Sequence, residues 1–537
     1  MAEPVVRIRD LTIALPKGAD RPHAVEGLSL DLEAGKILCV VGESGSGKSM
    51  SAYALTGLLP RALTVTGGSI AFEGRDLVRL DEAGWRPIRG RRIAMVFQEP
   101  MTALNPVMRI GDQIAEMFEA HDLLTRSERH DRVAALAAEV GLPNPSEIVR
   151  AYPHQLSGGQ RQRAMIAMAL ALEPTVLVAD EPTTALDVTT QAQILALVRD
   201  LQRRRGMSVL FITHDFGVVA EIADHVAVLQ RGRLVEAGPA AAVLHDPQAL
   251  YTKKLLAAVP SLTPPPRAAL DGAPVALSAV GLSKTYATKA GLFGRTRVVA
   301  AVDAVAFEVR RGETLGLVGE SGSGKSTTAR LAIRLVEPDG GTVRLGELDY
   351  TAVRPAALRS ERRRIQMIFQ DPFASLNPRR TVEQIITAGP IAHGVPAVQA
   401  RARARELLDL VGLDPAAAAR YPNAFSGGQR QRIGIARALA MKPDVLVADE
   451  AVSALDVSVQ AQVLDLLEDL KRRLSLAMLF ITHDLRVAAT ICDRIAVMHR
   501  GRIVETRRTV DLFAAPEHAY TRSLLAAVPG ARGGEVP

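Results

Sequence analysis

The stretch GESGSGKS occurs twice in this chain, at Gly42–Ser49 and again at Gly319–Ser326. Each copy follows a short apolar run that predicts a buried strand, and each precedes a segment with the pattern of a helix. Glycines at these spacings let successive backbone N–H groups turn toward an anion, and the N-terminus of the following helix adds positive potential. The pattern therefore predicts two phosphate-binding loops, each between a strand and a helix.

The lysine and the last serine of each loop have separate tasks. Lys48 and Lys325 are placed to reach the β- and γ-phosphates of a nucleotide, and the hydroxyl groups of Ser49 and Ser326 are placed to coordinate Mg²⁺. We expect both loops to contact the nucleotide along their whole length. Their residues are Gly42, Glu43, Ser44, Gly45, Ser46, Gly47, Lys48 and Ser49, and Gly319, Glu320, Ser321, Gly322, Ser323, Gly324, Lys325 and Ser326.

The rest of the chain repeats in the same order. VFQEPMTALNP returns as IFQDPFASLNP, LSGGQRQR returns as FSGGQRQR, and FITHD recurs unchanged, each about 270 residues later. The repeat predicts two domains, at residues 5–262 and 275–530. Residues 263–274 lie between them and contain Pro264-Pro265-Pro266. Three consecutive prolines favour an extended, semi-rigid tether.

Each half has the pattern of an α/β domain. Apolar runs such as Ile37–Val41 and Val176–Ala179 predict strands that are buried on both faces of a sheet. Longer segments such as Gly159–Leu172 and Gln191–Arg204 predict helices. The segment Asp224–Glu236 predicts a hairpin with its turn at Arg231-Gly232.

An acidic pair follows one apolar strand in each half. The first acid, Asp180 or Asp449, is placed to hold Mg²⁺ through water. The second acid, Glu181 or Glu450, is placed to accept a proton from the attacking water. An Asp-Glu pair after a strand is commonly only a solvated strand end. The phosphate loop upstream of each pair favours the catalytic interpretation.

Two more polar side chains follow strands in each half. His214 and His483 come where a neutral imidazole can hydrogen-bond a γ-phosphate or the attacking water. Gln98 and Gln370 follow short apolar runs, where an amide can ligate Mg²⁺ or orient water. Taken singly, these residues would be interpreted as a structural histidine and a polar cap. Because each half also carries a phosphate loop, we interpret the histidine and the glutamine of that half as parts of a nucleotide site.

A serine and two glycines open one predicted helix in each half. This composition presents backbone donors to an anion, although it also describes an ordinary helix cap. Each half would then carry two separate phosphate-binding elements, which is puzzling unless another half completes the site. The segments are Ser157, Gly158, Gly159 and Gln160, and Ser426, Gly427, Gly428 and Gln429.

The order of these motifs resembles the ATP-binding-cassette (ABC) ATPases, and the resemblance covers essentially the whole chain. It implies two tandem P-loop NTPase domains of the ABC type, each with a RecA-like α/β core, an antiparallel β subdomain and an α-helical subdomain. It also implies ATP and Mg²⁺ as cofactors. In that family two cassettes form a head-to-tail pair, in which the phosphate loop of one faces the SGGQ segment of the other.

Carried over to this chain, the resemblance implies two composite sites. The first would combine Lys48, Ser49, Gln98, Asp180, Glu181 and His214 with Ser426–Gln429. The second would combine Lys325, Ser326, Gln370, Asp449, Glu450 and His483 with Ser157–Gln160. Asp187 and Asp456 would communicate between the two sites.

A narrower resemblance is to the dipeptide, oligopeptide and nickel importer group. It rests on the Gln98–Pro106 and Gln370–Pro378 segments and on the tails DPQALYTKKLLAAVP (Asp246–Pro260) and APEHAYTRSLLAAVP (Ala515–Pro529). It implies two integral-membrane permease subunits, a solute-binding protein, and a peripheral position on the cytoplasmic face of the bacterial inner membrane. Peptides, glutathione, opines and nickel chelates all remain open as the solute.

The sequence departs from the family pattern at three places. Ala451-Val452 stands where the first half has Pro182-Thr183. The two cysteines cannot ligate the iron–sulfur cluster that some members of the group carry. Leu15 stands where an aromatic residue normally stacks on adenine, whereas Tyr286 keeps that role in the second half. We therefore expect the Lys325 site to bind ATP more tightly than the Lys48 site.

Two other function classes compete with an importer. A tandem-cassette ATPase that acts on ribosomes or nucleic acid would have a long charged linker or inserted zinc cysteines, and the net charge of +7 is spread here without a basic block. An exporter half-transporter would carry its own spans, whereas no run of about 20 apolar residues occurs. The N-terminus also lacks the pattern of a signal peptide. We expect no nucleic-acid partner.

Overall fold

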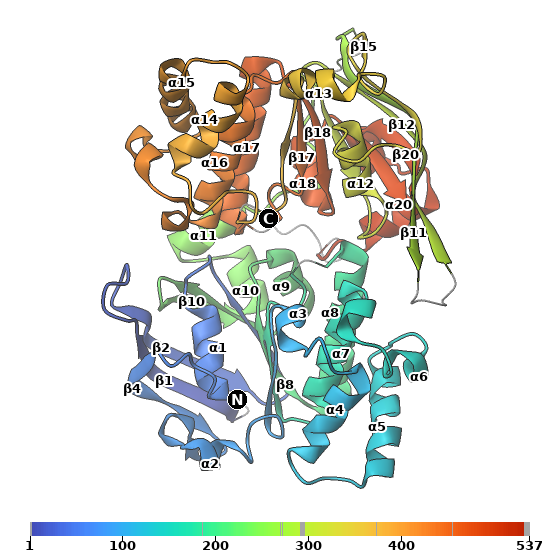
Figure 1. Ribbon diagram of the computed structural model, residues 1–537. Helices are drawn as coiled ribbons and strands as arrows, with labels where there is room; N and C mark the ends of the chain where they lie inside the picture. Colours follow the sequence, from blue (N-terminus) through green and yellow to red (C-terminus); the bar gives the residue numbers. More distant parts are fainter. Residues whose placement is uncertain are drawn as a thin grey trace. The chain divides into compact units, whose positions relative to one another are not determined.

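The computed structural model describes residues 3–184, 186–268, 270, 272–289, 296–371, 373–453 and 455–530. The chain divides into two compact units, Met1–Val259 with Val528–Pro537, and Pro260–Ala527. Each unit is an α/β cassette and is described by itself (Figure 1). Within the described residues, no helix is both long and apolar enough to cross a membrane.

The first cassette opens with an antiparallel sheet of order β2-β1-β4-β5. Its apolar residues alternate along β1 and β2, so that one face is buried and the other is solvated, as expected for an antiparallel sheet. The bounds are β1 Pro4–Ala14, β2 His23–Glu33, β4 Thr64–Phe72 and β5 Arg75–Asp76.

A second, largely parallel sheet carries the functional residues of the first cassette. Its order is β10-β9-β3-β8-β7-β6, with only β10 antiparallel. The bounds are β3 Ile37–Val41, β6 Ile93–Val96, β7 Val176–Asp180, β8 Ser208–Ile212, β9 His225–Gln230 and β10 Arg233–Pro239. Strands β9 and β10 form the hairpin that the sequence predicts, and its turn residues Arg231 and Gly232 both have positive φ.

Helices cover this sheet on both faces. Helices α4 to α7 gather on the side away from β1, β2 and β4 (Figure 1). The bounds are α1 Lys48–Thr56, α2 Glu82–Trp85, α3 Pro100–Ala103, α4 Ile110–Glu119, α5 Arg126–Glu139, α6 Pro145–Ile148, α7 Gly158–Leu170, α8 Val188–Arg205, α9 Phe216–Ile222, α10 Ala240–His245 and α11 Leu250–Ala257.

Strand β3 shows why the sequences of the central strands are continuous apolar runs. Ile37, Cys39 and Val41 pack into the core beneath the helices. Leu38 and Val40 point the other way, into the core shared with the antiparallel sheet. Because both faces of the strand are buried, every position must be apolar. This confirms the sequence-based interpretation of the strand and places its carboxyl end at the phosphate loop.

The second cassette repeats this architecture, with sheet orders β12-β11-β14-β15 and β16-β17-β18-β13-β19-β20. Its strands are β11 Val275–Lys289, β12 Thr296–Arg310, β13 Thr314–Val318, β14 Gly340–Leu345, β15 Leu348–Asp349, β16 Ile365–Ile368, β17 Val445–Asp449, β18 Ala477–Thr482, β19 Arg494–His499 and β20 Arg502–Arg508. Its helices are α12 Lys325–Ala332, α13 Pro355–Glu361, α14 Val382–Ala392, α15 Ala397–Leu410, α16 Gly427–Leu439, α17 Val457–Leu474, α18 Leu485–Ile491, α19 Thr509–Ala514 and α20 Ala519–Ala526.

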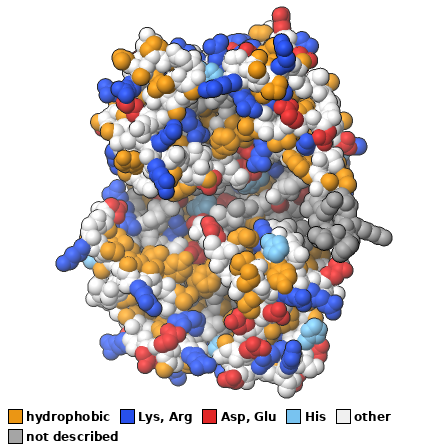
Figure 2. All heavy atoms as spheres, in the orientation of Figure 1, with side chains coloured by type: hydrophobic (Ala, Val, Ile, Leu, Met, Phe, Trp, Pro, Cys, Tyr) orange, Lys and Arg blue, Asp and Glu red, His pale blue; other side chains and the backbone are white. Residues whose placement is uncertain are grey.

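The face drawn in Figure 2 carries charged, apolar and other polar side chains on both units. On the face drawn in Figure 2, lysine and arginine do not collect into one basic surface. The two cysteines, Cys39 and Cys492, are both fully buried, and this burial raises the pKa of each thiol. A buried thiol with a raised pKa is a poor nucleophile and a poor metal ligand.

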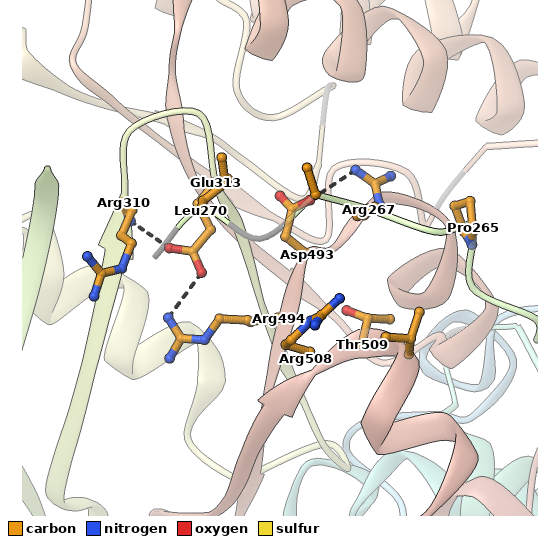
Figure 3. A pocket seen from close by; sticks show the side chains of 11 residues that line it. Pro265, Arg267, Leu270, Arg310, Glu313, Asp493, Arg494, Arg508 and Thr509 are labelled. Atoms are coloured by element: carbon orange, nitrogen blue, oxygen red, sulfur yellow. Dashed lines mark hydrogen bonds and ion pairs between the residues drawn. The ribbon is translucent and has the colours of Figure 1, made fainter. Parts of the chain in front are cut away.

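The start of the second unit includes residues 263–274, the segment for which the sequence predicts an extended tether; Ala269 and Asp271 lie outside the described residues. Arg267 anchors this segment on the second cassette (Figure 3). Its guanidinium pairs with Glu468 and Asp493, each at 3.2 Å, and donates to the Thr490 carbonyl at 2.6 Å. Lys471 also pairs with Asp493, at 3.1 Å. The ion pairs are largely buried, so this part of the segment has a fixed position on the second unit.

Candidate functional sites

The phosphate loop of the first cassette connects β3 to α1. Gly42 has φ 148°, and a Cβ there would lie 2.2 Å from the carbonyl oxygen of Leu229. Gly47, at the helix N-cap, has φ 99°, and its Cβ would lie 2.6 Å from the Ala24 carbonyl. Only glycine fits either position. Gly319 and Gly324 meet the same constraints in the second cassette.

The loop lysines lie inside their loops. Lys48 Nζ donates to the carbonyl oxygens of Gly42 at 2.7 Å and Glu43 at 3.0 Å. Lys325 Nζ donates to the carbonyl oxygens of Gly319 and Glu320, both at 2.7 Å. Both lysines are buried. Each ammonium group is therefore held against the backbone of its loop, where a phosphate bound in the loop would meet it.

Each loop also contains a buried serine hydroxyl without a hydrogen-bond partner in the described chain, on Ser46 and on Ser323. Buried hydroxyl groups almost always find a partner in native proteins. An anion bound in the loop would supply that partner. The residues present therefore fit a nucleotide phosphate in both cassettes.

The first acid of each pair contacts the last serine of the loop. Ser49 Oγ donates to Asp180 Oδ1 at 3.0 Å, and Ser326 Oγ donates to Asp449 Oδ1 at 3.0 Å. Burial raises the pKa of Asp180 to about 6, with the Ser49 hydrogen bond acting against it, and burial also raises the pKa of Asp449. The second oxygen of Asp180 is buried without a hydrogen-bond partner among the described residues. A divalent cation would satisfy that carboxylate, so the donor set fits Mg²⁺.

The second acid of each pair is the centre of a polar cluster. Gln98 Nε2 donates to Glu181 Oε2 at 3.0 Å, and His214 Nδ1 lies 3.2 Å from the same oxygen. Gln370 and His483 repeat the arrangement around Glu450 Oε2, at 2.8 and 3.4 Å. The structure thus brings together the glutamate, glutamine and histidine that the sequence singled out in each half.

The electrostatics of the cluster keep the glutamate ionised. Burial alone would raise the pKa of Glu181, but the hydrogen bond and charge of His214 and the charge of Lys48 lower it below its ordinary value. His483 and Lys325 lower the pKa of Glu450 in the same way, against burial. A carboxylate that stays charged and is held by two neighbours can accept a proton from water.

Both glutamates have a backbone conformation that glutamate rarely adopts. Glu181 has φ 45° and Glu450 has φ 48°. Each backbone N–H donates to a neighbouring strand, to Ile212 and Ile481 respectively, at 3.0 Å. Left-handed backbone at a residue other than glycine costs roughly 1 kcal/mol or more and is concentrated at functional sites. The chain therefore turns sharply at the point where this side chain leaves the sheet.

The SGGQ segments open helices α7 and α16. Ser157 Oγ accepts from the Gln160 backbone N–H at 3.3 Å, and Gln160 Oε1 accepts from the Ser157 N–H at 2.9 Å. Ser426 and Gln429 form the same capping box. These capping hydrogen bonds join residues within each SGGQ segment. Asp187 and Asp456 are the N-cap residues of α8 and α17.

The two cassettes differ at the position expected to contact adenine. Tyr286 lies on β11 with 43% of its surface exposed. Leu15, its counterpart, packs against the core of the first cassette. In the first cassette Arg21, from the loop between β1 and β2, donates to the Gly45 carbonyl of the phosphate loop.

Sequence reasoning missed several contacts of these sites. Thr184 Oγ1 donates to Glu181 Oε2 at 3.0 Å. Tyr251 and Tyr520 contact the backbone N–H groups of Glu43 and Glu320 in the phosphate loops. The tyrosines occur in the recurring tail motif, and this recurrence was the signal that could have found them. Arg21 lies in a part of the chain that does not repeat and left no such signal.

Comparison with known proteins agrees with this geometry. The family model described as ABC transporter matches residues 25–184 and 302–453. The chain belongs to the ATP-binding-cassette transporter family. As a member of that family it is an ATPase with two cassettes in tandem. A second model, described as the C-terminal region of oligopeptide/dipeptide transporters, matches residues 235–289 and 504–535.

Relatives in this family align along nearly the whole chain. The proteins named glutathione import ATP-binding protein GsiA from Escherichia coli O157:H7 and from Escherichia coli K12 are each 48% identical to it, over 98% of this chain and 89% of theirs. Among solved structures, an ATP-binding cassette dimer bound to ADP and phosphate aligns at 27% identity over 44% of this chain and 98% of that one, with a TM-score of 0.40.

Proposed function

We propose that this chain is the ATP-hydrolysing motor subunit of a bacterial importer that takes up glutathione or a related small peptide. The duplicated cluster of lysine, glutamate, glutamine and histidine carries the ATPase part of the proposal, because both copies are complete. The two oligopeptide-transporter tail regions and the relatives named for glutathione import support the direction and the solute class.

The proposed chemistry assigns one role to each contact in the first site. Lys48 and the loop N–H groups bind the phosphates, and Glu181 accepts a proton from the attacking water, which Gln98 and His214 orient. Mg²⁺ held by Ser49, Asp180 and Gln98 would neutralise charge on the phosphates. Lys325, Glu450, Gln370 and His483, with Ser326 and Asp449, repeat these roles in the second site.

We infer that each site is completed by the SGGQ segment of the other cassette. The capping boxes leave the first backbone N–H groups of α7 and α16 directed along the helix axis, where they can bind a γ-phosphate. ATP would then favour the closed pair of cassettes over the open pair, since it contacts both only when they are closed. Asp187 and Asp456 would relay this state between the two sites.

Two integral-membrane permease subunits are the proposed partners, with a solute-binding protein that delivers the solute. In the first cassette an apolar cavity of about 270 Å³ lies beside the Gln98 segment and is lined by four methionines and Phe97. The methionines are Met95, Met117, Met165 and Met168. Flexible methionines suit a helix with an apolar face. The chain would lie on the cytoplasmic face of the inner membrane through these partners.

The two Gln segments also expose apolar side chains at equivalent positions. Met101 is 49% exposed, and Phe373 is 62% exposed with the Arg430 guanidinium 3.9 Å from its ring centroid. An exposed apolar residue beside a catalytic glutamine is a suitable contact for a moving permease helix. The alternative, an ATPase acting on ribosomes or nucleic acid, would instead need a basic surface.

The importer proposal predicts that acidic substitutions at these positions prevent assembly. Met101→Asp combined with Phe373→Asp is expected to abolish co-purification with the two permease subunits, since a charge cannot be buried there without a partner. Nucleotide binding should remain. Val280→Asp is the matched control, because Val280 is 61% exposed on the antiparallel sheet. Assembly that survives the double substitution would contradict the proposed contact.

The solute class is tested in the assembled transporter. Its ATPase rate is expected to rise when the solute-binding protein is loaded with glutathione or a tripeptide. Stimulation only by a nickel chelate would reject the peptide assignment but keep the importer. Stimulation of the chain by ribosomes or nucleic acid, with no response to permease subunits, would reject the importer.

A second prediction concerns unequal nucleotide binding. The Lys325 site is expected to bind ATP several-fold more tightly than the Lys48 site, because base stacking on an aromatic ring contributes roughly 1–3 kcal/mol and Tyr286, unlike its counterpart Leu15, supplies a ring. Nucleotide titrations of Lys48→Ala and Lys325→Ala separate the sites, and Tyr286→Leu should remove the difference. Equal affinities together with no loss in Tyr286→Leu would show that the two positions are equivalent.

A further inference from the structure

The tail motif of each cassette has no part in the catalytic cluster, although both copies are closely similar. It begins after the β9–β10 hairpin in the first cassette and after β19–β20 in the second. Glu236 on β10 accepts hydrogen bonds from the backbone N–H groups of Gln248 and Ala249, at 2.7 and 3.1 Å. Glu505 on β20 holds Glu517 and His518 in the same way. A buried or half-buried carboxylate thus fixes the entry to α11 and to α20.

The second residue of each of these helices is a tyrosine that reaches the phosphate loop. Tyr251 Oη accepts a hydrogen bond from the Glu43 backbone N–H at 3.4 Å. Tyr520 Oη accepts one from the Glu320 N–H at 3.2 Å. Some tail residues differ between the two copies, such as Leu250 and Ala519 before the tyrosines, but this contact is present in both. In each case the donor is the second residue of the loop.

The contacted N–H group shares a peptide plane with a carbonyl that holds the catalytic lysine. The Gly42–Glu43 peptide carries the Glu43 N–H at one edge and the Gly42 carbonyl at the other, and that carbonyl accepts from Lys48 Nζ at 2.7 Å. Because a peptide unit is planar, fixing its N–H also fixes its carbonyl. The Gly319–Glu320 peptide joins Tyr520 to Lys325 through the same geometry.

This peptide needs an external contact because a glycine begins it. Gly42 and Gly319 have φ 148° and 153°. Glycine has no Cβ, so it adopts this region of φ and neighbouring regions at little energetic cost. Without a brace, rotation at the glycine would turn the carbonyl away from the lysine. The tyrosine hydroxyl, which accepts from the N–H of this peptide, opposes the rotation in both cassettes.

We propose that Tyr251 and Tyr520 are positioning residues of the two ATP sites, and that each tail motif fixes the conformation of its phosphate loop through this hydroxyl. The tail would thereby tune ATP affinity without touching ATP. The proposal depends on the ATPase activity of the chain and not on the identity of the solute.

The test removes only the hydroxyl groups. Tyr251→Phe and Tyr520→Phe, separately and together in the full chain, are expected to raise KM for ATP about three- to tenfold, the effect of losing one hydrogen bond. The kcat value should stay within about twofold, because the loop binds the ground state and the transition state alike. Titration with a non-hydrolysable ATP analogue should show the same loss of affinity.

A matched control removes a hydroxyl contact elsewhere. Tyr350 is fully buried and donates through its hydroxyl to the Ile333 carbonyl at 3.4 Å. Tyr350→Phe should leave KM unchanged, even if the melting temperature falls. Glu236→Ala and Glu505→Ala, which release the tail from its anchor, should reproduce the rise in KM.

The values of KM and kcat in these variants distinguish a positioning role of the tyrosines from a merely structural one. A rise in KM with kcat retained in the tyrosine variants, and not in Tyr350→Phe, supports the proposal. Unchanged KM and analogue affinity, or a fall in kcat alone, would overturn it and leave the tyrosines a structural role. A chain that hydrolyses ATP normally but imports nothing would reject the importer while leaving this test valid.

Discussion

In the Glu181→Gln variant, the assembled transporter is expected to retain bound ATP while its turnover falls by about a hundredfold or more. The amide keeps the shape of the side chain and its contacts with Gln98 and Thr184, but it cannot accept a proton from water. Glu450→Gln should have the same effect, since Glu450 has the equivalent contacts with Gln370 and His483. The measurements are the steady-state ATPase rate and the nucleotide retained after gel filtration.

The control for this pair must share the unusual backbone of the catalytic residue. Glu173 also has a positive φ, at 54°, and its side chain pairs with Arg132 on the surface. Glu173→Gln should leave turnover unchanged. Wild-type turnover in either Glu181→Gln or Glu450→Gln would show that only one site hydrolyses ATP.

The Lys48→Ala variant is expected to lose ATP affinity at the first site by about a hundredfold. Charge-assisted hydrogen bonds to phosphate are each worth roughly 1.5–3 kcal/mol, and the buried ammonium group is placed to reach two phosphates. Lys325→Ala should do the same at the second site. Isothermal titration with ATP reports both the number of sites and their affinities.

Lys36→Ala is the matched control for the loss of ATP affinity in Lys48→Ala. Lys36 precedes β3, at the opposite end of the strand from the phosphate loop, and pairs with Asp224 on the surface at 3.5 Å. Lys36→Ala removes the same charge from the same cassette, so its ATP affinity should match the wild type. Two full-affinity sites in Lys48→Ala would mean that the loop N–H groups alone hold the phosphates.

Features of the fold and the site that depend on a short stretch of sequence could be predicted from the sequence alone. The apolar run of β3 predicted a strand buried on both faces, because each residue's side chain alternates between two cores. The glycine spacing predicted the loop, because backbone near Leu229 and Ala24 leaves no room for a Cβ. The clustering of Glu181, Gln98 and His214 followed from the rule that parallel strands end at one edge of the sheet.

Features that depend on distant parts of the chain could not be derived in this way. Tyr251 meets Glu43 across 208 positions of sequence, and nothing near either residue indicates the other. Arg267 is an ordinary surface residue in a proline-rich segment until its partners Glu468 and Asp493 are known. The left-handed backbone of Glu181 is imposed by the sheet, against the preference of glutamate.

The anchoring of Arg267 favours one order of the two cassettes along the chain. In the second cassette Glu468 pairs directly with the Arg267 guanidinium, and Lys471 pairs with both Glu468 and Asp493 beside it. The corresponding positions of the first cassette are Arg199 and Gln202, and Arg199 there donates to the Glu221 carbonyl. A chain built with the halves exchanged would present arginine to arginine at this junction. The two copies of the repeat therefore differ where the segment after the first cassette attaches, and this difference favours the order found in the chain.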